Sequence, residues 1–445
     1  MIAYLAGVLV IVVGVALSIA LHEIGHLVPA KRFGVKTTQY MVGFGPTVWS
    51  TKRGETEYGV KWIPLGGYIR MVGMFPPVAG RPVRADSTGR LALLAEQARS
   101  ESQREIGDVP TERLFYAKPV WQRLIIMLGG PTMNLIIAIV LLTGIMVGYG
   151  MPEQSTQLAS VSQCVIPATA PAGQTCRPTD PAAPAAAAGL KPGDTIVSFE
   201  GKPVDDWAQV RNAIAAAPGK TLSLGIERDG KPLTVSVSPV SNVRYVLDGD
   251  NQPVVGSDGQ RLTERVGFLG VTPTTVNVKQ SVTAVPAVLG DYLGKTAGVV
   301  LRIPQKMVGV AQAAFGGAER DPNGPMSIVG VSRVAGEVAS ADSPSDITTT
   351  TLDRFVGLLS LIMSLNLALF IFNLVPLLPL DGGHAAGAIW EGLRRQIARA
   401  RHRPDPGPVD VARALPIAYG VASLLIGMSV LLIYADLVRP IKLGG

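Results

Sequence analysis

Four long stretches of this sequence contain no Asp, Glu, Lys or Arg, and each is long enough to cross a membrane as a helix. They cover residues 1–21, 124–147, 355–380 and 414–434. A bilayer core of about 30 Å needs roughly 20 helical residues. With 47% hydrophobic residues and a mean hydropathy of +0.32, the chain is too apolar for one soluble domain. The sequence predicts a polytopic α-helical membrane protein with four transmembrane helices.

The first stretch has an alternative interpretation as a cleaved signal sequence. A signal sequence begins with a positively charged region, but the first basic residue of this chain is Lys31. We therefore expect residues 1–21 to remain as part of the first transmembrane helix.

Basic residues are concentrated in two of the segments that separate these stretches. Lys31, Arg32 and Lys36 follow the first stretch closely, and Lys52 and Arg53 come soon after. The segment between the last two stretches carries Arg394, Arg395, Arg399, Arg401, Arg403 and Arg413. Loops rich in Lys and Arg stay in the cytoplasm. This asymmetry predicts a multi-pass plasma-membrane protein with its N-terminus, residues 149–353 and its C-terminus outside the cytoplasm.

The formal net charge of +7 is explained by these cytoplasmic loops, which favour the anionic headgroups of the lipid bilayer. No folded basic domain with interleaved aromatic residues accompanies them, so we expect no nucleic-acid partner.

His22, Glu23 and His26 stand at the end of the first stretch. Residues four apart share one face of a helix, so the two imidazoles can bind one metal ion. Glu23 can reach a water held by that ion without being a ligand. The alternative is a polar helix end with surface histidines. It is disfavoured because ionisable residues at membrane depth are energetically expensive and usually functional. The pattern indicates a metal site inside the membrane.

A possible third ligand, Asp381, follows the third stretch. Pro376 and Pro379 break the helix before it. The first and third helices would both run from outside to inside, so Asp381 would reach the depth of His22 and His26. Two histidines and one carboxylate leave a coordination position open for water, as in catalytic zinc sites. By itself, Asp381 would be better explained as a turn residue of an Asp-Gly pair.

These motifs resemble the site-2 protease family of intramembrane zinc metalloproteases. The resemblance rests on the His-Glu-x-x-His at 22–26 and on Asn-x-x-Pro-x-x-x-Leu-Asp-Gly at 373–382, and it extends over essentially the whole chain. A third motif of the family, Gly-Pro-x-x-Asn, is present at 130–134. The chain looks like an actinobacterial member of the bacterial group that carries a PDZ-like insert and cuts anti-sigma factors.

The resemblance implies that His22, His26 and Asp381 hold one catalytic zinc ion and that Glu23 is the catalytic base. It further implies that Asn373 and Asn134 line the substrate path. The expected function is a metalloendopeptidase that cuts previously trimmed, single-pass membrane proteins such as anti-sigma factors in regulated intramembrane proteolysis. The active site is expected near the cytoplasmic side.

Asn373 and Asn366 lie seven residues apart on the third helix and have two interpretations. Either one could donate hydrogen bonds to an unwound substrate backbone, each worth about 1–2 kcal/mol in a membrane. Alternatively, they join neighbouring helices. The role of His384, as a partner of the Asp381 turn or an incidental residue, stays open, as do the substrate, the cleavage position and the oligomeric state.

The cytoplasmic segment after the first helix is predicted to contain a β-hairpin. Residues 40–51 and 57–70 are rich in strand-forming residues, and residues 52–55 have the composition of a turn. An extended substrate could add to the edge of such a sheet. The family resemblance implies that this sheet is associated with the membrane beside the active site. We interpret residues 77–112 as a cytoplasmic linker.

Outside the membrane, strand-like segments at 196–199, 221–227, 232–237 and 267–271 and a helix at 207–217 resemble a PDZ domain. The domain could bind a peptide or act as a size filter against uncut proteins. Cys164 and Cys176 fall in this segment, where a disulfide can form; two free thiols or a metal pair are the alternatives. Residues 281–318 are amphipathic and are expected on the outer membrane surface.

These predictions divide the chain into eight segments. They are helix 1 (1–30), a cytoplasmic loop with the sheet (31–122), helix 2 (123–148), the PDZ-like α+β domain (158–275), an extracytoplasmic amphipathic region (276–350), helix 3 (354–380), a basic cytoplasmic loop (381–412) and helix 4 (413–437).

Two other functional classes are compatible with parts of this pattern. A metal transporter could use two histidines and an aspartate at membrane depth, but it would not need Glu23. A scaffold would keep the PDZ-like domain but would not use the three candidate zinc ligands.

Overall fold

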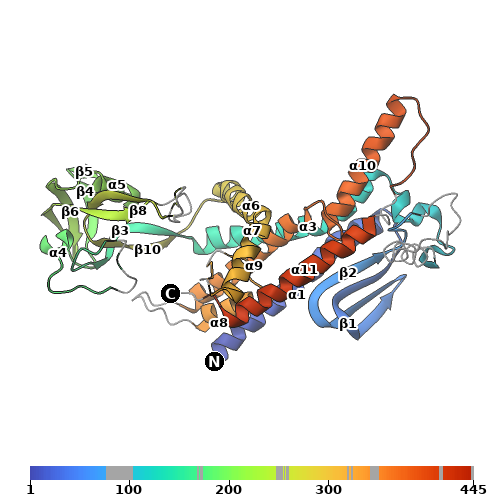
Figure 1. Ribbon diagram of the computed structural model, residues 1–445, viewed down its shortest axis with the longest axis horizontal. Helices are drawn as coiled ribbons and strands as arrows, with labels where there is room; N and C mark the ends of the chain where they lie inside the picture. The colour runs from blue at the N-terminus through green and yellow to red at the C-terminus, as the bar shows by residue number, and fades with distance from the viewer. Residues whose placement is uncertain are drawn as a thin grey trace. The chain divides into compact units, whose positions relative to one another are not determined.

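The structure is a computed structural model of the 445-residue chain. It describes residues 1–76, 104–167, 170, 174–246, 254, 256, 260–317, 320–321, 324–340, 350–409 and 414–441. The chain forms two compact units (Figure 1). Unit 1 comprises Met1–Gly148 and Ser281–Gly445, and unit 2 comprises Tyr149–Gln280.

Within the described part of the chain, four helices are long and apolar enough to cross a membrane, as the sequence predicted. They are α1 (Ile2–Arg32), α3 (Val120–Thr143) with its continuation η3 (Gly144–Tyr149), α9 (Thr351–Asn373) and α11 (Leu415–Val438). The third helix is shorter than predicted, because it ends at Asn373 rather than at residue 380. Pro376 and Pro379 lack the N–H that continues a helix, so the chain turns and then begins α10 (Asp381–Ala400).

The relative directions of these helices follow from the residues that meet between them. Gly14 of α1 packs against Ile362 of α9, and Ser18 accepts a hydrogen bond from Asn366. Residue numbers therefore increase in the same direction along α1 and α9. Both helices end on the same side of unit 1, where the turn after α9 brings Asp381 to α1.

Helix α3 runs opposite to α1 and touches it backbone to backbone. A Cβ atom placed on Gly25 would lie 2.3 Å from the Gly129 carbonyl oxygen, and one on Gly129 would lie 2.0 Å from that of Gly25. Small residues permit such close approach between membrane helices. This contact brings α3 within hydrogen-bonding reach of the histidines on α1.

The predicted hairpin is present as β1 (Thr37–Arg53) and β2 (Thr56–Met71). Gly54 turns the chain between them in the left-handed region, at φ +63°. Bulges bend both strands, so Tyr40 pairs with Tyr58 on one side and with Ile69 on the other. The strand segment of residues 67–71 is consequently an edge, and among the described residues its outer side pairs with no other strand.

Shorter helices complete unit 1. They are η1 (Thr111–Arg113), η2 (Phe115–Ala117), η4 (Val282–Ala284), α6 (Val285–Leu301), α7 (Ile303–Phe315) and α8 (Ile328–Ser340). None of these is a candidate membrane span. Helix α8 packs on the N-terminal part of α1, where Gly336 faces the ring of Tyr4. Most of the predicted linker, residues 77–103, lies outside the described residues.

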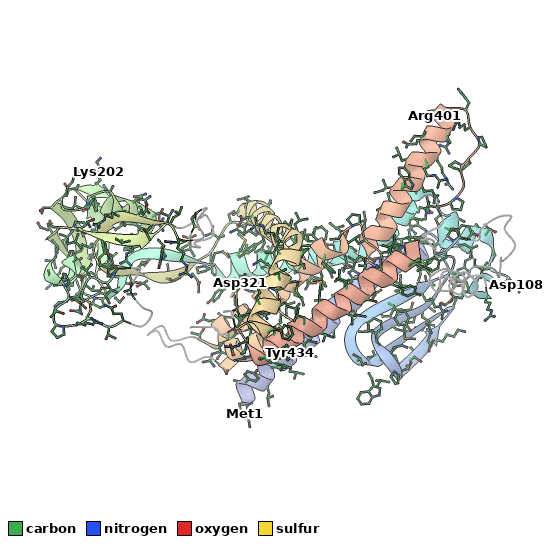
Figure 2. All side chains as sticks on the ribbon, in the orientation of Figure 1. Met1, Asp108, Lys202, Asp321, Arg401 and Tyr434 are labelled. Carbon is green, nitrogen blue, oxygen red and sulfur yellow. A yellow bond between two sulfur atoms is a disulfide. The ribbon has the colours of Figure 1, made fainter. Side chains whose placement is uncertain are left out.

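Residues 381–412 were predicted as a basic loop, but α10 occupies residues 381–400. Its apolar positions recur with a helical period and its arginines cluster near its C-terminal end. Figure 2 shows Arg401 at the end of α10 that projects from the other helices of unit 1.

Unit 2 is an α+β domain. Its main sheet has the strand order β10-β3-β4-β6-β7, and β5 pairs with β4. The strands are β3 (Met151–Val161), β4 (Thr195–Phe199), β5 (Lys202–Pro203), β6 (Leu222–Arg228), β7 (Lys231–Val237) and β10 (Val271–Val278). A separate pair is formed by β8 (Val240–Tyr245) and β9 (Thr263–Phe268), and the helices are α4 (Pro184–Ala187) and α5 (Trp207–Ala215).

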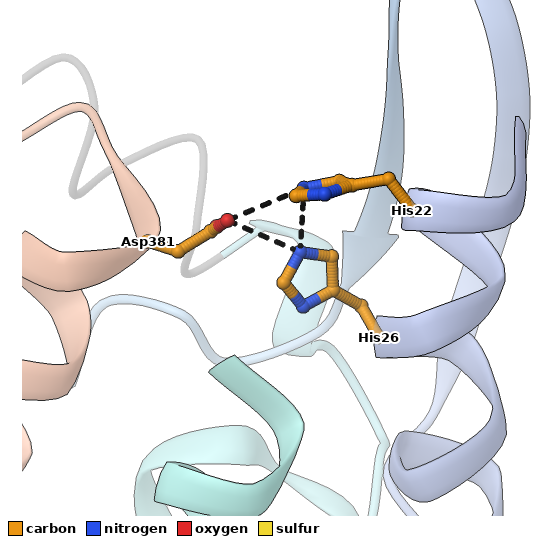
Figure 3. Close-up of side chains that lie close together, drawn as sticks. All are labelled: His22, His26 and Asp381. Carbon is orange, nitrogen blue, oxygen red and sulfur yellow. Dashed lines mark hydrogen bonds and ion pairs between the residues drawn. The ribbon is translucent and has the colours of Figure 1, made fainter. Parts of the chain in front are cut away.

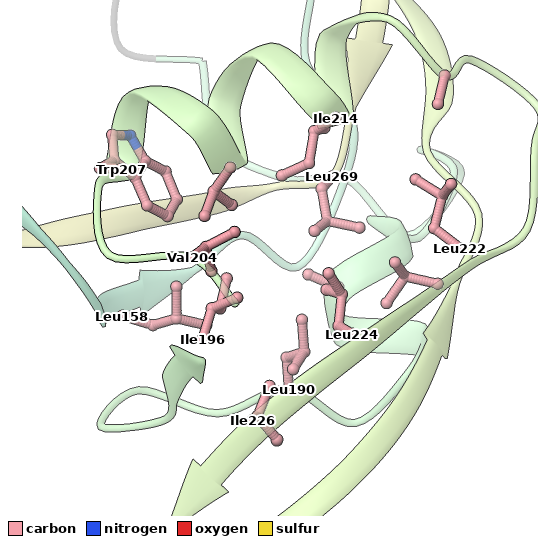
Figure 4. Packing of buried hydrophobic residues seen from close by; sticks show 14 residues of the cluster. Leu158, Leu190, Ile196, Val204, Trp207, Ile214, Leu222, Leu224, Ile226 and Leu269 are labelled. Atoms are coloured by element: carbon pink, nitrogen blue, oxygen red, sulfur yellow. The ribbon is translucent and has the colours of Figure 1, made fainter. Parts of the chain in front are cut away.

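Helix α5 covers an apolar core in unit 2 (Figure 4). Trp207 and Ile214 from this helix are packed with Ile196, Leu224 and Ile226 from the sheet. The disulfide between Cys164 and Cys176 also lies in this unit. The core and the paired first and last strands indicate that unit 2 is a self-contained domain, and its predicted bounds of 158–275 fall inside it.

The prediction of one strand at 267–271 is wrong, because β9 ends at Phe268 and β10 begins at Val271. Leu269 is buried in the core and Gly270 has a φ of +88°, so the backbone changes direction between the two strands.

Candidate metal centre

His22, His26 and Asp381 come together in unit 1 (Figure 3). The two Nε2 atoms of the histidines on α1 lie 3.2 Å apart. Asp381, the first residue of α10, places its Oδ2 atom 3.3 Å from Nε2 of His22 and 3.4 Å from Nε2 of His26. Three donor atoms from residues up to 359 positions apart in sequence (381 − 22) thus form a nearly equilateral triangle.

This triangle has the dimensions of one face of a zinc tetrahedron. Zinc–nitrogen and zinc–oxygen bonds are about 2.0–2.2 Å, so neighbouring donor atoms lie about 3.3 Å apart. The Oδ2 atom of Asp381 is buried and has no hydrogen-bond partner among the described residues. A buried carboxylate oxygen without a donor is suited to a cation. The three residues therefore fit a zinc ion, with a fourth position available to water or substrate.

Helix α3 lines this centre together with α1 and α10, which carry the three candidate ligands. Its Gly130 faces the imidazoles so closely that a Cβ atom there would lie 2.2 Å from Nε2 of His26 and 2.7 Å from Nε2 of His22. Only a residue without a side chain leaves room for an ion. Steric fit thus explains why the first position of the Gly-Pro-x-x-Asn motif is a glycine.

The same helix contacts the Nδ1 atom of each imidazole, the ring nitrogen that is not part of the donor triangle. Nδ1 of His26 lies 2.7 Å from the carbonyl oxygen of Ile126, and Nδ1 of His22 lies 3.1 Å from the side-chain nitrogen of Asn134. A carbonyl only accepts, so His26 donates from Nδ1 and keeps the Nε2 lone pair for a metal. No sequence signal identifies Ile126, since any residue can supply a backbone carbonyl.

Glu23 is buried beside the edge strand of the β1–β2 sheet. A Cβ atom on Gly67 would lie 3.0 Å from its Cγ atom, and the backbone N–H of Ile69 hydrogen-bonds to its carboxylate. Tyr40 of β1 also ties the sheet to α1, because its hydroxyl donates to the Ala20 carbonyl oxygen at 2.9 Å. Burial raises the pKa of Tyr40 to about 12, so this hydroxyl keeps its proton at neutral pH.

A buried ion pair holds α10, and hence Asp381, against α3. Arg123 donates to both carboxylate oxygens of Glu391, at 2.5 Å and 3.1 Å, and both side chains are buried. Glu391 also accepts from the backbone N–H of Val409. Breaking one partner of such a pair typically costs about 3–5 kcal/mol. His384 lines a small pocket with Arg123 and Glu391, and burial lowers the pKa of its imidazole.

The asparagines of the third membrane helix lie in different environments. Asn366 is fully buried and donates to Ser18 at 2.9 Å and to the Ile362 carbonyl oxygen at 2.8 Å. It joins two helices, as one of the two interpretations of this residue predicted. Asn373 is half-buried at the end of α9, eight residues before Asp381 (381 − 373).

Comparison with models of protein families matches residues 10–404 to "Peptidase family M50". The chain is 33% identical to the zinc metalloprotease Rip1 of Mycobacterium tuberculosis, over 99% of both chains. It is 32% identical to Rip1 of Mycolicibacterium smegmatis over 98% of both chains. It is also 28% identical to the metalloprotease MmpA of Caulobacter vibrioides, over 86% of this chain and 85% of that protein.

Proposed function

Because the chain belongs to peptidase family M50, we propose that it hydrolyses peptide bonds within or beside the transmembrane helices of other membrane proteins. The chain is a zinc metalloprotease with four candidate membrane helices. The observation that carries the proposal is the position of His22, Glu23 and His26 on one of these helices, with the Oδ2 atom of Asp381 3.3 Å and 3.4 Å from the Nε2 atoms of the two histidines. We assign the two histidines and Asp381 as the zinc ligands and Glu23 as the catalytic base.

The reaction needs a nucleophilic water and a proton for the leaving amine. Bound zinc supplies a Lewis acid for the scissile carbonyl and lowers the pKa of the attacking water. Glu23 accepts the proton of that water and delivers it to the nitrogen of the leaving amine. The Ile69 N–H donates a hydrogen bond to the Glu23 carboxylate and so helps to orient it, and Glu23 and His26 are both buried.

A helical substrate must unwind before attack, because its carbonyl oxygens are occupied by its own hydrogen bonds. The edge at residues 67–71 lies beside Glu23 and can pair with the unwound segment by strand addition. Asn373, half-buried near the end of α9, is the better placed asparagine for further hydrogen bonds to that backbone. We propose substrates of the anti-sigma-factor type, single-pass proteins already trimmed by another protease.

Metal removal tests this function. We expect the purified protein to contain about one zinc ion and to cut a synthetic transmembrane peptide. A chelator should stop cleavage, and added zinc should restore it. Cleavage can be followed by mass spectrometry of the peptide in detergent. Undiminished cleavage by metal-free protein would contradict the proposal.

The orientation in the plasma membrane follows from the basic loops, with unit 2 outside and α10 in the cytoplasm. Cysteines introduced at Gln157 and Arg401, both exposed, would test it. The two native cysteines are joined in a disulfide, so they leave a low labelling background. We expect an impermeant thiol reagent to label position 157 in intact cells and position 401 only after permeabilisation. Labelling of position 401 in intact cells would reverse the proposed sidedness.

We assign unit 2 as a PDZ-like domain that restrains the protease by excluding substrates with large external domains. All the proposed ligands and the base belong to unit 1, which supports a role outside the chemistry. Residues 161–273 can be replaced by a short Gly/Ser linker, because β3 and β10 remain paired from Met151↔Val278 to Thr275↔Gln154. We expect this variant to cut the short peptide at the normal rate and also to cut untrimmed substrates. If the folded, zinc-loaded variant cannot cut the short peptide, unit 2 instead delivers substrate.

A further inference from the structure

The contact between Asn134 and His22 is a polar contact of the centre whose chemistry the proposed mechanism does not use. Asn134 is fully buried on α3, and its amide lies 3.1 Å from the Nδ1 atom of His22. The Nε2 atom of the same imidazole points at Asp381 and His26. Asn134 is therefore an outer partner of a proposed zinc ligand.

The tautomer of His22 decides whether this ligand is competent. A neutral imidazole carries one proton, so Nε2 can bind a metal only when Nδ1 holds that proton. If the Asn134 NH2 group donated to Nδ1, the proton would be on Nε2 and would block the metal. Rotating the amide by 180° exchanges its oxygen and nitrogen at nearly the same positions. The carbonyl oxygen then accepts from Nδ1–H.

The arrangement at His26 supports the assignment in which the carbonyl oxygen of Asn134 accepts from Nδ1–H of His22. There the outer partner is the carbonyl oxygen of Ile126, which can only accept. Ile126, Gly130 and Asn134 are spaced by four residues along α3, so they lie on one face of that helix. One helix face thus offers an acceptor to each imidazole and, between the two acceptors, a position without a side chain.

We propose that Asn134 is a positioning residue whose carbonyl oxygen accepts the Nδ1–H of His22 and thereby keeps the Nε2 lone pair directed at zinc. The inference rests on the proposed assignment of His22 as a ligand. The Asn134 NH2 group then has no partner among the described residues.

Zinc affinity of the full-length protein, measured by competition with a chromophoric chelator, tests the proposal. Replacing Asn134 with Leu removes the acceptor and keeps a similar volume. Loss of an outer hydrogen-bond partner typically weakens metal binding by 10–100-fold. We expect that loss in Asn134→Leu. Asn134→Asp should retain zinc affinity within about threefold of the original, because a carboxylate also accepts from Nδ1–H.

Asn366 provides a matched control. It is equally buried, lies on a membrane helix and bonds to α1 through Ser18, one turn before His22. Asn366→Leu should therefore disturb packing to a similar extent but change zinc affinity by less than threefold. Thermal unfolding of each variant in detergent reports the packing effect separately from zinc binding.

Three outcomes would overturn the proposal. Unchanged zinc affinity in Asn134→Leu would mean that His22 needs no outer acceptor. Equal losses in Asn134→Leu and Asn134→Asp would mean that the amide NH2 is the group that matters. Equal losses of zinc affinity in Asn134→Leu and Asn366→Leu would mean that Asn134 affects zinc binding only through helix packing. His22→Ala separates this proposal from the ligand assignment, because unchanged zinc affinity in that variant would refute His22 as a ligand.

Discussion

Replacement of Glu23 with Gln should lower the rate of peptide cleavage by about 100- to 10,000-fold, the usual contribution of a general base. Gln has nearly the same shape as Glu but cannot accept a proton from water. Zinc content should not change, because the three proposed ligands remain in place. The measurement is the initial rate of cleavage of a transmembrane peptide, with zinc determined by elemental analysis of the same sample.

Glu337→Gln is the control for the Glu23 variant. Glu337 is a half-buried glutamate on α8 that pairs with Arg333, and it is not part of the metal centre. We expect this variant to retain nearly full activity. If Glu23→Gln also retained nearly full cleavage activity, the assignment of Glu23 as the catalytic base would be refuted.

Replacement of Gly130 with Ala should abolish stoichiometric zinc binding and, with it, cleavage. The added methyl group would lie 2.2 Å from one imidazole nitrogen and 2.7 Å from the other, within the space that an ion between them needs. The imidazoles would have to turn away, so the ligand triangle would be lost. Zinc content per protein and the rate of peptide cleavage would both be measured.

Gly144→Ala is the matched control on the same membrane span. A Cβ atom at Gly144 would meet no atom within 4 Å, and its backbone is helical. We expect zinc content and activity to be unchanged there. A zinc-loaded and active Gly130→Ala protein would show that α3 does not limit the space of the centre.

Much of the candidate site could be predicted from the sequence, because its strongest signals are local. His22, Glu23 and His26 lie within five consecutive residues, and helical geometry alone puts both imidazoles on one face. Asp381 could be linked to them because successive spans are expected to alternate in direction, and α1 and α9 do run in the same direction. The outer partner Ile126 could not be predicted, since it contributes only its backbone.

In the fold, too, some features could be predicted from the sequence and others could not. The four membrane helices were predictable because a bilayer requires long apolar helices, and composition alone reveals them. The end of the third helix at Asn373, the helix at Asp381–Ala400 and the break at Leu269–Gly270 were not predicted. Of these, α10 is held in place by a contact far apart in sequence, the Arg123–Glu391 pair, which joins residues 268 positions apart.

The sequence by itself determined the class of protein, the four candidate membrane spans and the identities of the candidate ligands, because period, length and spacing are properties of neighbouring residues. The tertiary structure decided which surfaces meet. Gly130 and Asn134 belong to a motif in the sequence, but their contacts with the two histidines exist only because α3 crosses α1 at Gly25 and Gly129. Such contacts depend on the packing of whole helices, and no local pattern of residues specifies them.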